Sequence, residues 1–185
     1  MESPQLILAS GSSIRKELLT KAGVQFECIP SNINEDLFDP LDATERAIQK
    51  AMAVSKQYNN AWVIGADQIC HLNGEVFHKP LTKPNAIQTL KKLSGNTHTL
   101  LTAVAMVLNG IKHWSHLETI QLKMKPLSIK TIVDYVDTDN PIYSCGAYQY
   151  EANGHALFET VSHSSDAIQG LPLEPLMKHI CHHIR

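Results

Sequence analysis

Residues 6–19, LILASGSSIRKELL, join an apolar run to a polar turn and a basic helix start. The first N–H groups of a helix have no partners within it and lie at its positive end, so they bind phosphate readily. Gly11 permits a tight turn, and Ser10 adds a hydroxyl donor. Arg15 and Lys16 oppose the helix dipole unless an anion offsets them. The segment indicates an anion site, although an ordinary serine N-cap with both cations in solvent explains it equally.

A second chemical signal is Asp67, which interrupts the apolar residues 61–72, AWVIGADQICHL. A carboxylate within an apolar strand is costly unless it is paired or holds a metal. Gly65, two positions earlier, leaves room for a close approach of another element. The alternative is an Asp at the solvent end of the strand, in an Asx turn. The pattern favours an interior strand that carries a reactive carboxylate.

Four further charged side chains are candidates for the same site. Lys50 lies within a predicted helix, and Lys79 follows a predicted strand just before Pro80. Glu35 and Asp36 lie in an acidic, irregular segment. Each of them, taken alone, also fits an ordinary solvated surface residue.

Helices and strands alternate along the chain and must position these groups. Apolar residues at helical spacing, with polar caps before them and glycines after them, predict helices at about 14–22, 42–58, 82–93, 128–136 and 173–180. Apolar or alternating runs predict strands at 6–9, 24–29, 61–72, 75–80, 99–108, 111–125 and 155–162.

Two Asn-Gly pairs, at 73–74 and 109–110, are strong signals for tight hairpins, which require antiparallel neighbours. Strands that alternate with helices favour parallel neighbours instead. We therefore expect an α/β fold with a mixed sheet flanked by helices.

Size and composition limit the class of protein. A chain of 185 residues with 43% hydrophobic residues supports one domain, residues 1–185, with room for two lobes. The net charge of −2 and the lack of a Lys/Arg run argue against a nucleic-acid polymer or an anionic membrane as partner. The start of the chain has no basic, apolar leader pattern, and no stretch approaches the roughly 18 apolar residues of a membrane span, so we expect a cytosolic protein.

The cysteines and histidines suggest no further chemistry. Four scattered cysteines without a Cys-x-x-Cys pair predict reduced, mostly packed thiols. His179, Cys181, His182 and His183 cluster near the C-terminus, with His179 and His183 on one helix face. A metal site there is an alternative, but a polar chain end explains the cluster better.

Six motifs in order resemble the Maf family, nucleoside triphosphate pyrophosphatases once described as septum-formation inhibitors. They run from about Leu6 to Leu176 and read LILASGS, GADQ, HKPLT, KLSGNTHTLLT, CGAYQYEANG and GLPL. The resemblance implies the fold of the inosine triphosphatase (Ham1) group, with a central cleft between two lobes, and a homodimer. It also implies hydrolysis of a nucleotide to the monophosphate and pyrophosphate with Mg²⁺ or Mn²⁺, as house-cleaning of non-standard nucleotides.

The resemblance also assigns roles to residues of this chain. Asp67 takes the position of the general base and of a metal ligand, and Glu35 that of the acidic metal-binding residue. The phosphate-binding positions are Ser10, Arg15, Lys50 and Lys79. A triphosphate with Mg²⁺ needs such cations, together with a carboxylate for the metal.

Three positions that sort substrates within the family carry Ile14, Gln68 and Glu151. Gln68 and Glu151 resemble the branch that acts on 7-methyl-GTP, and a carboxylate suits the two adjacent donors and the positive charge of that base. Ile14 departs from the Trp usual in that branch and forgoes a cation–π contact of about 0.5–2 kcal/mol. Ser144 and Cys145 differ from the Lys-Ala pair of the pyrimidine branch.

Two other functions remain open at this point. One is a dTTP/UTP pyrophosphatase of the same family, which differs only in the choice of base. The other is a non-catalytic nucleotide-binding regulator of cell division, against which the presence of Asp67, Lys79 and Arg15 argues. Pyrophosphate release from a panel of nucleotides distinguishes the three.

Overall fold

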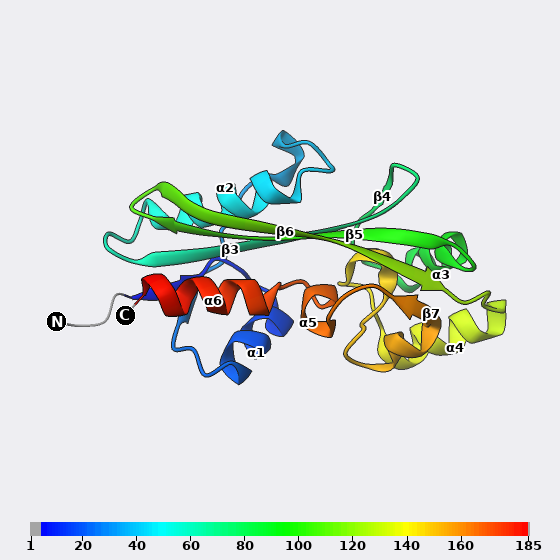
Figure 1. Ribbon diagram of the computed structural model, residues 1–185. Coiled ribbons are helices and arrows are strands. Elements are labelled where there is room, and N and C mark those ends of the chain that lie inside the picture. The colour runs from blue at the N-terminus through cyan, green and yellow to red at the C-terminus, as the bar shows by residue number, and fades with distance from the viewer. Residues whose placement is uncertain (1–4, 185) are drawn as a thin grey trace. The chain divides into compact units, whose positions relative to one another are not determined.

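The computed structural model describes residues 5–184 (Figure 1). In chain order the elements are β1 (Leu6–Leu8), α1 (Ser13–Lys21), β2 (Glu27–Cys28), the 3-10 helix η1 (Glu35–Leu37), α2 (Ala43–Ser55), β3 (Trp62–Leu72), β4 (Glu75–Phe77), α3 (Lys83–Leu93), β5 (Thr97–Leu108), β6 (Ile111–Met124), α4 (Ile129–Asp139), the 3-10 helices η2 (Cys145–Ala147) and η3 (Asn153–Leu157), β7 (Phe158–Val161), α5 (Ser165–Ile168) and α6 (Leu173–His183).

The seven strands of residues 5–184 form one mixed sheet. Their order is β2-β1-β3-β5-β6-β7, with β4 paired to β3. β1 runs parallel to both neighbours, since Ile7 lies opposite Glu27 and Val63, whereas β4 is antiparallel to β3 and β7 to β6. The mixed-sheet α/β prediction is confirmed.

Both predicted hairpins are present. Asn73 and Gly74 have φ of 52° and 87°, and Asn109 and Gly110 have φ of 50° and 75°. Positive φ at both turn positions is typical of the type I′ turn, whose twist matches that of the paired strands. The first turn joins β3 to β4, and the second joins β5 to β6.

The helices begin at the polar caps that the sequence indicates. Ser12, Asp42, Thr82 and Ser128 each accept a hydrogen bond from the backbone N–H three residues later. Gly23, with φ of 75°, follows the end of α1, where a left-handed residue is favoured.

Some elements are shorter than predicted. The strand expected at 24–29 is reduced to β2, because this edge strand pairs only with the short β1 and both of its residues are exposed. α2 ends at Ser55 rather than near residue 58. The strand expected at 155–162 begins at Phe158, since the preceding residues form η3.

The chain divides into two compact units, in agreement with the two lobes that the resemblance implies. Unit 1 contains the described residues up to Asp67, residues 102–118 and those from Gly170 on, and unit 2 contains residues 68–101 and 119–169. β3, β5 and β6 each contribute residues to both units.

In unit 1, helices cover both faces of the strands (Figure 1). Leu6 and Leu8 of β1 pack in one cluster with Leu19 of α1 and Ile180 of α6. The intervening Ile7 packs in another cluster with residues of α2. Side chains alternate along a strand, so β1 is apolar throughout because both of its faces are covered.

Unit 2 has its own core between its strands and α3, α4 and α5. It contains Leu90, Leu122, Val136 and Ile168 among its buried residues. His98 lies inside this core, 1% exposed, and its Nε2 is 2.9 Å from the hydroxyl of Tyr148. Burial, together with the nearby His71, lowers the pKa of His98 to about 4.

The cysteines are free thiols, as predicted, but only two are packed: Cys70 is buried and Cys145 is half-buried, whereas Cys28 and Cys181 are exposed. Burial raises the pKa of the Cys70 thiol. No helix among the described residues is long and apolar enough to cross a membrane.

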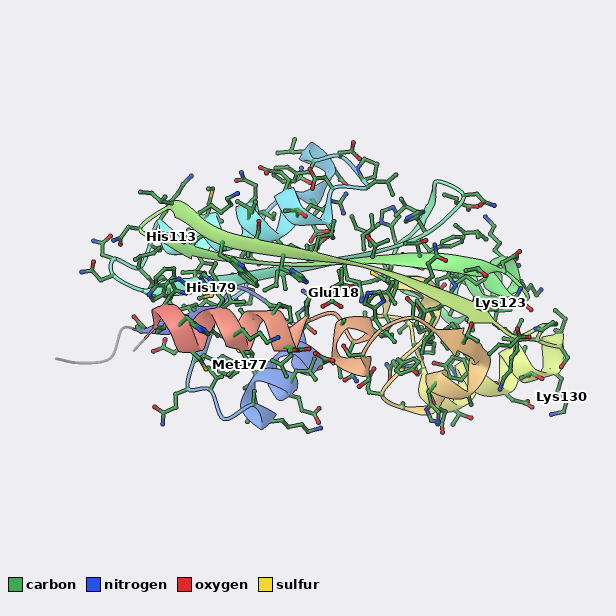
Figure 2. All side chains as sticks on the ribbon, viewed as in Figure 1. His113, Glu118, Lys123, Lys130, Met177 and His179 are labelled. Atoms are coloured by element: carbon green, nitrogen blue, oxygen red, sulfur yellow. The ribbon has the colours of Figure 1, made fainter. Side chains whose placement is uncertain are left out.

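The C-terminal histidines belong to a stack of rings in unit 1. His179 and His183 share one face of α6, as predicted, with ring centroids 4.2 Å apart. His179, labelled on α6 in Figure 2, also stacks on Trp114 of β6 at 4.8 Å. Burial and the neighbouring His183 lower the pKa of His179. Within residues 5–184, no group of three or more His, Cys, Asp or Glu side chains is placed to hold a metal.

Candidate active site

Asp67 lies in the middle of β3 and is 4% exposed. The prediction of a carboxylate on an interior strand is confirmed, and the alternative of an Asx turn at a strand end is wrong. A buried carboxylate requires a partner, and the ammonium of Lys50 on α2 forms an ion pair with its Oδ1.

Gly65 explains why α2 can approach β3 closely enough for that pair. A Cβ at position 65 would overlap the carbonyl oxygen of Ala47 and would lie 2.9 Å from the backbone nitrogen of Ala51. Both residues belong to α2. The missing side chain therefore brings the helix backbone against the strand and places Lys50 beside Asp67.

Lys50 also binds the predicted acidic residue. Its Nζ lies 2.7 Å from Oε1 of Glu35, which stands on η1 with its side chain 45% exposed. The Lys50 side chain itself is only 12% exposed. The structure thus brings together Lys50, Asp67 and Glu35, with one cation between two carboxylates.

The loop after β1 supplies the predicted donors. Ser10 is 8% exposed, and its Oγ accepts a hydrogen bond of 3.1 Å from the backbone N–H of Ser12. Ser12 in turn caps α1, accepting from the backbone N–H of Arg15. Since a hydroxyl keeps its own O–H donor while it accepts, Ser10 retains a proton for an anion.

Arg15 turns inward from the first turn of α1 rather than into solvent. Its Nε donates to the carbonyl oxygen of Gly170 at 2.8 Å, and its Nη1 donates to that of Ala66 at 2.9 Å. Nη1 also lies 3.5 Å from Oγ of Ser10. The fixed guanidinium therefore stands next to the polar loop and to the residue that precedes Asp67, whereas Lys16 is exposed.

The remaining predicted residues are distributed over the chain. Ile14, on α1, is half-buried and belongs to unit 1. Gln68, Lys79 and Glu151 belong to unit 2, where Lys79 and Glu151 are exposed. Ser10, Arg15, Lys50, Asp67 and Glu35 all belong to unit 1.

Within unit 2, Gln68 has a fixed orientation. Its Nε2 donates to the carbonyl oxygens of Ala167 at 3.3 Å and Ile168 at 2.9 Å. The Sγ of Cys145 lies 3.6 Å from the backbone oxygen of Gln68, so η2 lies against this part of β3.

Glu151 stands in the turn that precedes η3. The neighbouring Tyr135 accepts a hydrogen bond of 2.9 Å from the backbone N–H of Gln149. Burial raises the pKa of Tyr135 well above its usual range, and the charges of Asp139 and Glu151 add to this.

The family model described as Maf-like protein matches residues 5–183. The chain belongs to the Maf-like family. The Maf-like chain is 37% identical to a nucleoside triphosphate pyrophosphatase of Legionella pneumophila (strain Paris), over 96% of this chain and 92% of the relative. It is 39% identical to a 7-methyl-GTP pyrophosphatase of Rhizobium johnstonii, over 95% and 94% of the two chains.

Solved structures with a similar fold include two Ham1 proteins. The Maf-like chain matches one from Coxiella burnetii with a TM-score of 0.55 and 16% identity, over 97% of this chain and 99% of the other. It matches one from Staphylococcus aureus with a TM-score of 0.51 and 18% identity, over 96% and 98%. The expected similarity in fold to the Ham1 group is confirmed.

The carboxylates of the Maf-like site fit a divalent cation. Oδ2 of Asp67 is buried and has no hydrogen-bond partner in the part of the chain that the structure describes. Such an oxygen is a ligand that Mg²⁺ and Mn²⁺ accept, and Glu35 offers a second carboxylate across Lys50. Since Mg²⁺ retains waters and shares phosphate oxygens, two carboxylates are enough protein ligands.

No sequence pattern indicated Arg46, although it lies in the same Maf-like site. Its Nη1 forms an ion pair of 3.6 Å with Oε2 of Glu35, and the residue is 7% exposed. Its spacing of four residues from Lys50 on α2 could have suggested a shared helix face. Nothing in the sequence marks that face as buried, because a charged residue on a helix is normally solvated.

Proposed function

We propose that this Maf-like protein, a nucleoside triphosphate pyrophosphatase, hydrolyses 7-methyl-GTP to the monophosphate and pyrophosphate with Mg²⁺ or Mn²⁺. The observation that carries the proposal is the buried Asp67 of β3, which has one oxygen on Lys50 and the other without a partner among the described residues. A carboxylate placed in this way can accept a proton and hold a metal.

Four residues would bind the phosphates. Ser10 and the fixed guanidinium of Arg15 lie side by side at the start of α1, where backbone N–H groups add further donors. Lys50 and Lys79 would supply the other charges, because a triphosphate carries about four negative charges near neutral pH. Arg15 would hold phosphate oxygens through its planar guanidinium, whose fork of donors suits a phosphate group.

In the reaction, Asp67 orients a water molecule against the α-phosphorus and accepts its proton. The P–O bond to the β-phosphate breaks, and the charge that develops on pyrophosphate is stabilised by Arg15, Lys50 and Lys79. A divalent cation bound by Asp67 and Glu35 would lower the pKa of that water and neutralise the phosphate oxygens. Lys50 can pass from the carboxylates to the phosphates because a lysine has three donors on a flexible stem.

Substitution of Asp67 by Asn tests the catalytic assignment. The amide keeps the size of the side chain and a carbonyl oxygen for Lys50, while Lys50 also keeps Glu35, so the fold should persist. We expect pyrophosphate release to fall by at least about 100-fold, the usual loss for a removed general base. The matched control is Asp36→Asn, an exposed charge on η1 that should leave turnover unchanged. Retained turnover in Asp67→Asn would contradict the proposal.

Gln68 and Glu151 support the choice of 7-methyl-GTP. The carboxylate of Glu151 can accept both donors of the guanine edge and favours the positive charge of the methylated ring. Gln68 would face the base in one orientation, since its amide nitrogen is bound to the backbone of α5. Ile14 would add an apolar contact without cation–π stabilisation.

A nucleotide panel tests the substrate. Pyrophosphate release is compared for 7-methyl-GTP, GTP, UTP and TTP, each with Mg²⁺, with Mn²⁺ and without metal. We expect 7-methyl-GTP to be preferred and every activity to require metal. A preference for UTP or TTP would instead indicate the pyrimidine branch, and tight binding without pyrophosphate release would indicate a regulator.

The homodimer and the cytoplasmic location also belong to the proposal. Light scattering of the purified protein tests the former: a mass near 41 kDa, twice the 20.5 kDa chain, is expected. A mass near that of one chain would exclude the dimer.

A further inference from the structure

Arg46 is a buried cation that the proposed mechanism does not use. It lies on α2, 7% exposed, and its Nε is buried without a hydrogen-bond partner in the described part of the chain. A guanidinium is always charged, and its burial is costly unless it is well paired. A single ion pair of 3.6 Å with Glu35 offsets only a small part of the free energy lost by burying the guanidinium. This suggests that Arg46 has a role in another state of the site.

Arg46 is the outer member of an alternating series of charges. Glu35 presents its Oε2 to Arg46 and its Oε1 to Lys50, and Lys50 continues to Asp67. The two cations lie four residues apart on α2 and so share one side of the helix. Glu35 is thus held from two directions, by one cation that also touches Asp67 and by one that does not.

A divalent cation changes this arrangement. An ammonium between Glu35 and Asp67 repels a metal that binds the same two carboxylates, so Lys50 must turn away when a metal–triphosphate complex enters. Glu35, on the exposed η1, would then lose its short contact of 2.7 Å. The ion pair of Arg46 uses the other carboxylate oxygen of Glu35, Oε2, so this contact can persist when Lys50 turns to the phosphates.

We infer that Arg46 is a positioning residue that holds Glu35 for the metal while Lys50 transfers to the phosphates. This inference rests on the proposed function. It assigns to Arg46 no contact with the substrate, and its effect must therefore pass through Glu35.

A double-mutant cycle tests this dependence. The variants are Arg46→Met, Glu35→Gln and the double variant, and the measurement is Mn²⁺ retention by electron paramagnetic resonance with a non-hydrolysable nucleoside triphosphate analogue. Arg46→Met should weaken Mn²⁺ retention about fivefold, as expected for coupled neighbours, and should have no effect in the Glu35→Gln background. Equal losses in both backgrounds would overturn the inference.

Kinetics and a conservative variant separate positioning from a structural role. Arg46→Met should raise the Mn²⁺ concentration for half-maximal turnover, with KM for nucleotide at saturating Mn²⁺ changed by less than about twofold. Arg46→Lys should restore most of the Mn²⁺ retention. Arg46→Gln, which also removes the charge, replaces Arg46→Met in the cycle if Arg46→Met does not fold. Lys56→Met, which removes an exposed charge just beyond α2, should change nothing.

The double-mutant cycle distinguishes a failure of this inference from a failure of the proposed function. If the wild-type protein released no pyrophosphate from any nucleotide, the proposed function would fail, but the Mn²⁺ measurements would still show whether Arg46 acts through Glu35. If pyrophosphate were released and the two substitutions were additive, only the present inference would fail.

Discussion

At the scale of single residues, charge pairing governs the site in unit 1. Lys50 neutralises Asp67 inside an apolar strand, and Glu35 and Arg46 extend the pairing to the surface. Asp67 could be predicted because a carboxylate is anomalous in an apolar run, and that anomaly is visible in the sequence. The burial of Arg46 could not be predicted, because it depends on the packing of α2 against η1, which no local pattern encodes.

Glu151→Gln tests the choice of base at one atom. An amide can accept only one of the two guanine donors and directs its own donor at the other, so kcat/KM for 7-methyl-GTP should fall about tenfold relative to UTP. The ratio of kcat/KM for the two nucleotides is the measurement. Glu159→Gln, an exposed charge on β7 of the same unit, is the control. An unchanged ratio would remove Glu151 from base recognition.

His98 makes unit 2 sensitive to acid. The unfolded chain binds a proton on this imidazole near pH 6.5, whereas the folded protein binds it only near pH 4. Between these values the unfolded state holds more protons, so stability is lost as the pH falls, up to roughly 3 kcal/mol at pH 4. Urea unfolding at several pH values should show this loss reduced in His98→Gln. Parallel pH dependences in the two proteins would exclude His98 as the cause.

At the scale of elements, caps and turns were more predictable than lengths. The N-caps at Ser12 and Asp42 and the Asn-Gly turns depend on neighbouring residues only, and they are where the sequence indicates. The extent of β2 depends on its pairing with the short β1, which lies far off in sequence. Apolar alternation at 24–29 cannot reveal how long the partner strand is.

Gly65→Ala tests the approach of α2 to β3. The new methyl group would overlap the Ala47 carbonyl, so α2 must shift, with a loss of stability of about 3 kcal/mol or more and of the contact between Lys50 and Asp67. Chemical unfolding and pyrophosphate release should both decline. Gly11→Ala, where a Cβ meets only Pro30 at 3.9 Å, should keep its stability within about 0.5 kcal/mol. Equal stabilities would show that the helix does not depend on this glycine.

At the scale of the whole molecule, ligand binding should raise the free energy of unfolding. A non-hydrolysable 7-methyl-GTP analogue with Mg²⁺ at about 100 times its dissociation constant should stabilise the folded chain by about 2.7 kcal/mol. Thermal unfolding with and without a chelator measures the effect. We expect the chelator to remove it, because Glu35 and Asp67 would hold the cation. An unchanged midpoint in the chelator would mean that nucleotide binds without metal.

Both tryptophans of the chain, Trp62 and Trp114, belong to unit 1, so unit 2 contains no tryptophan. Indole emission excited at the red edge of its absorption therefore originates wholly from the unit that carries Asp67. Each indole also lies within 5 Å of an imidazole, His113 beside Trp62 and His179 beside Trp114. Because imidazolium quenches indole, loss of the proton from His179 should brighten Trp114. A spectrometer can therefore follow this half of the chain without a chemical label.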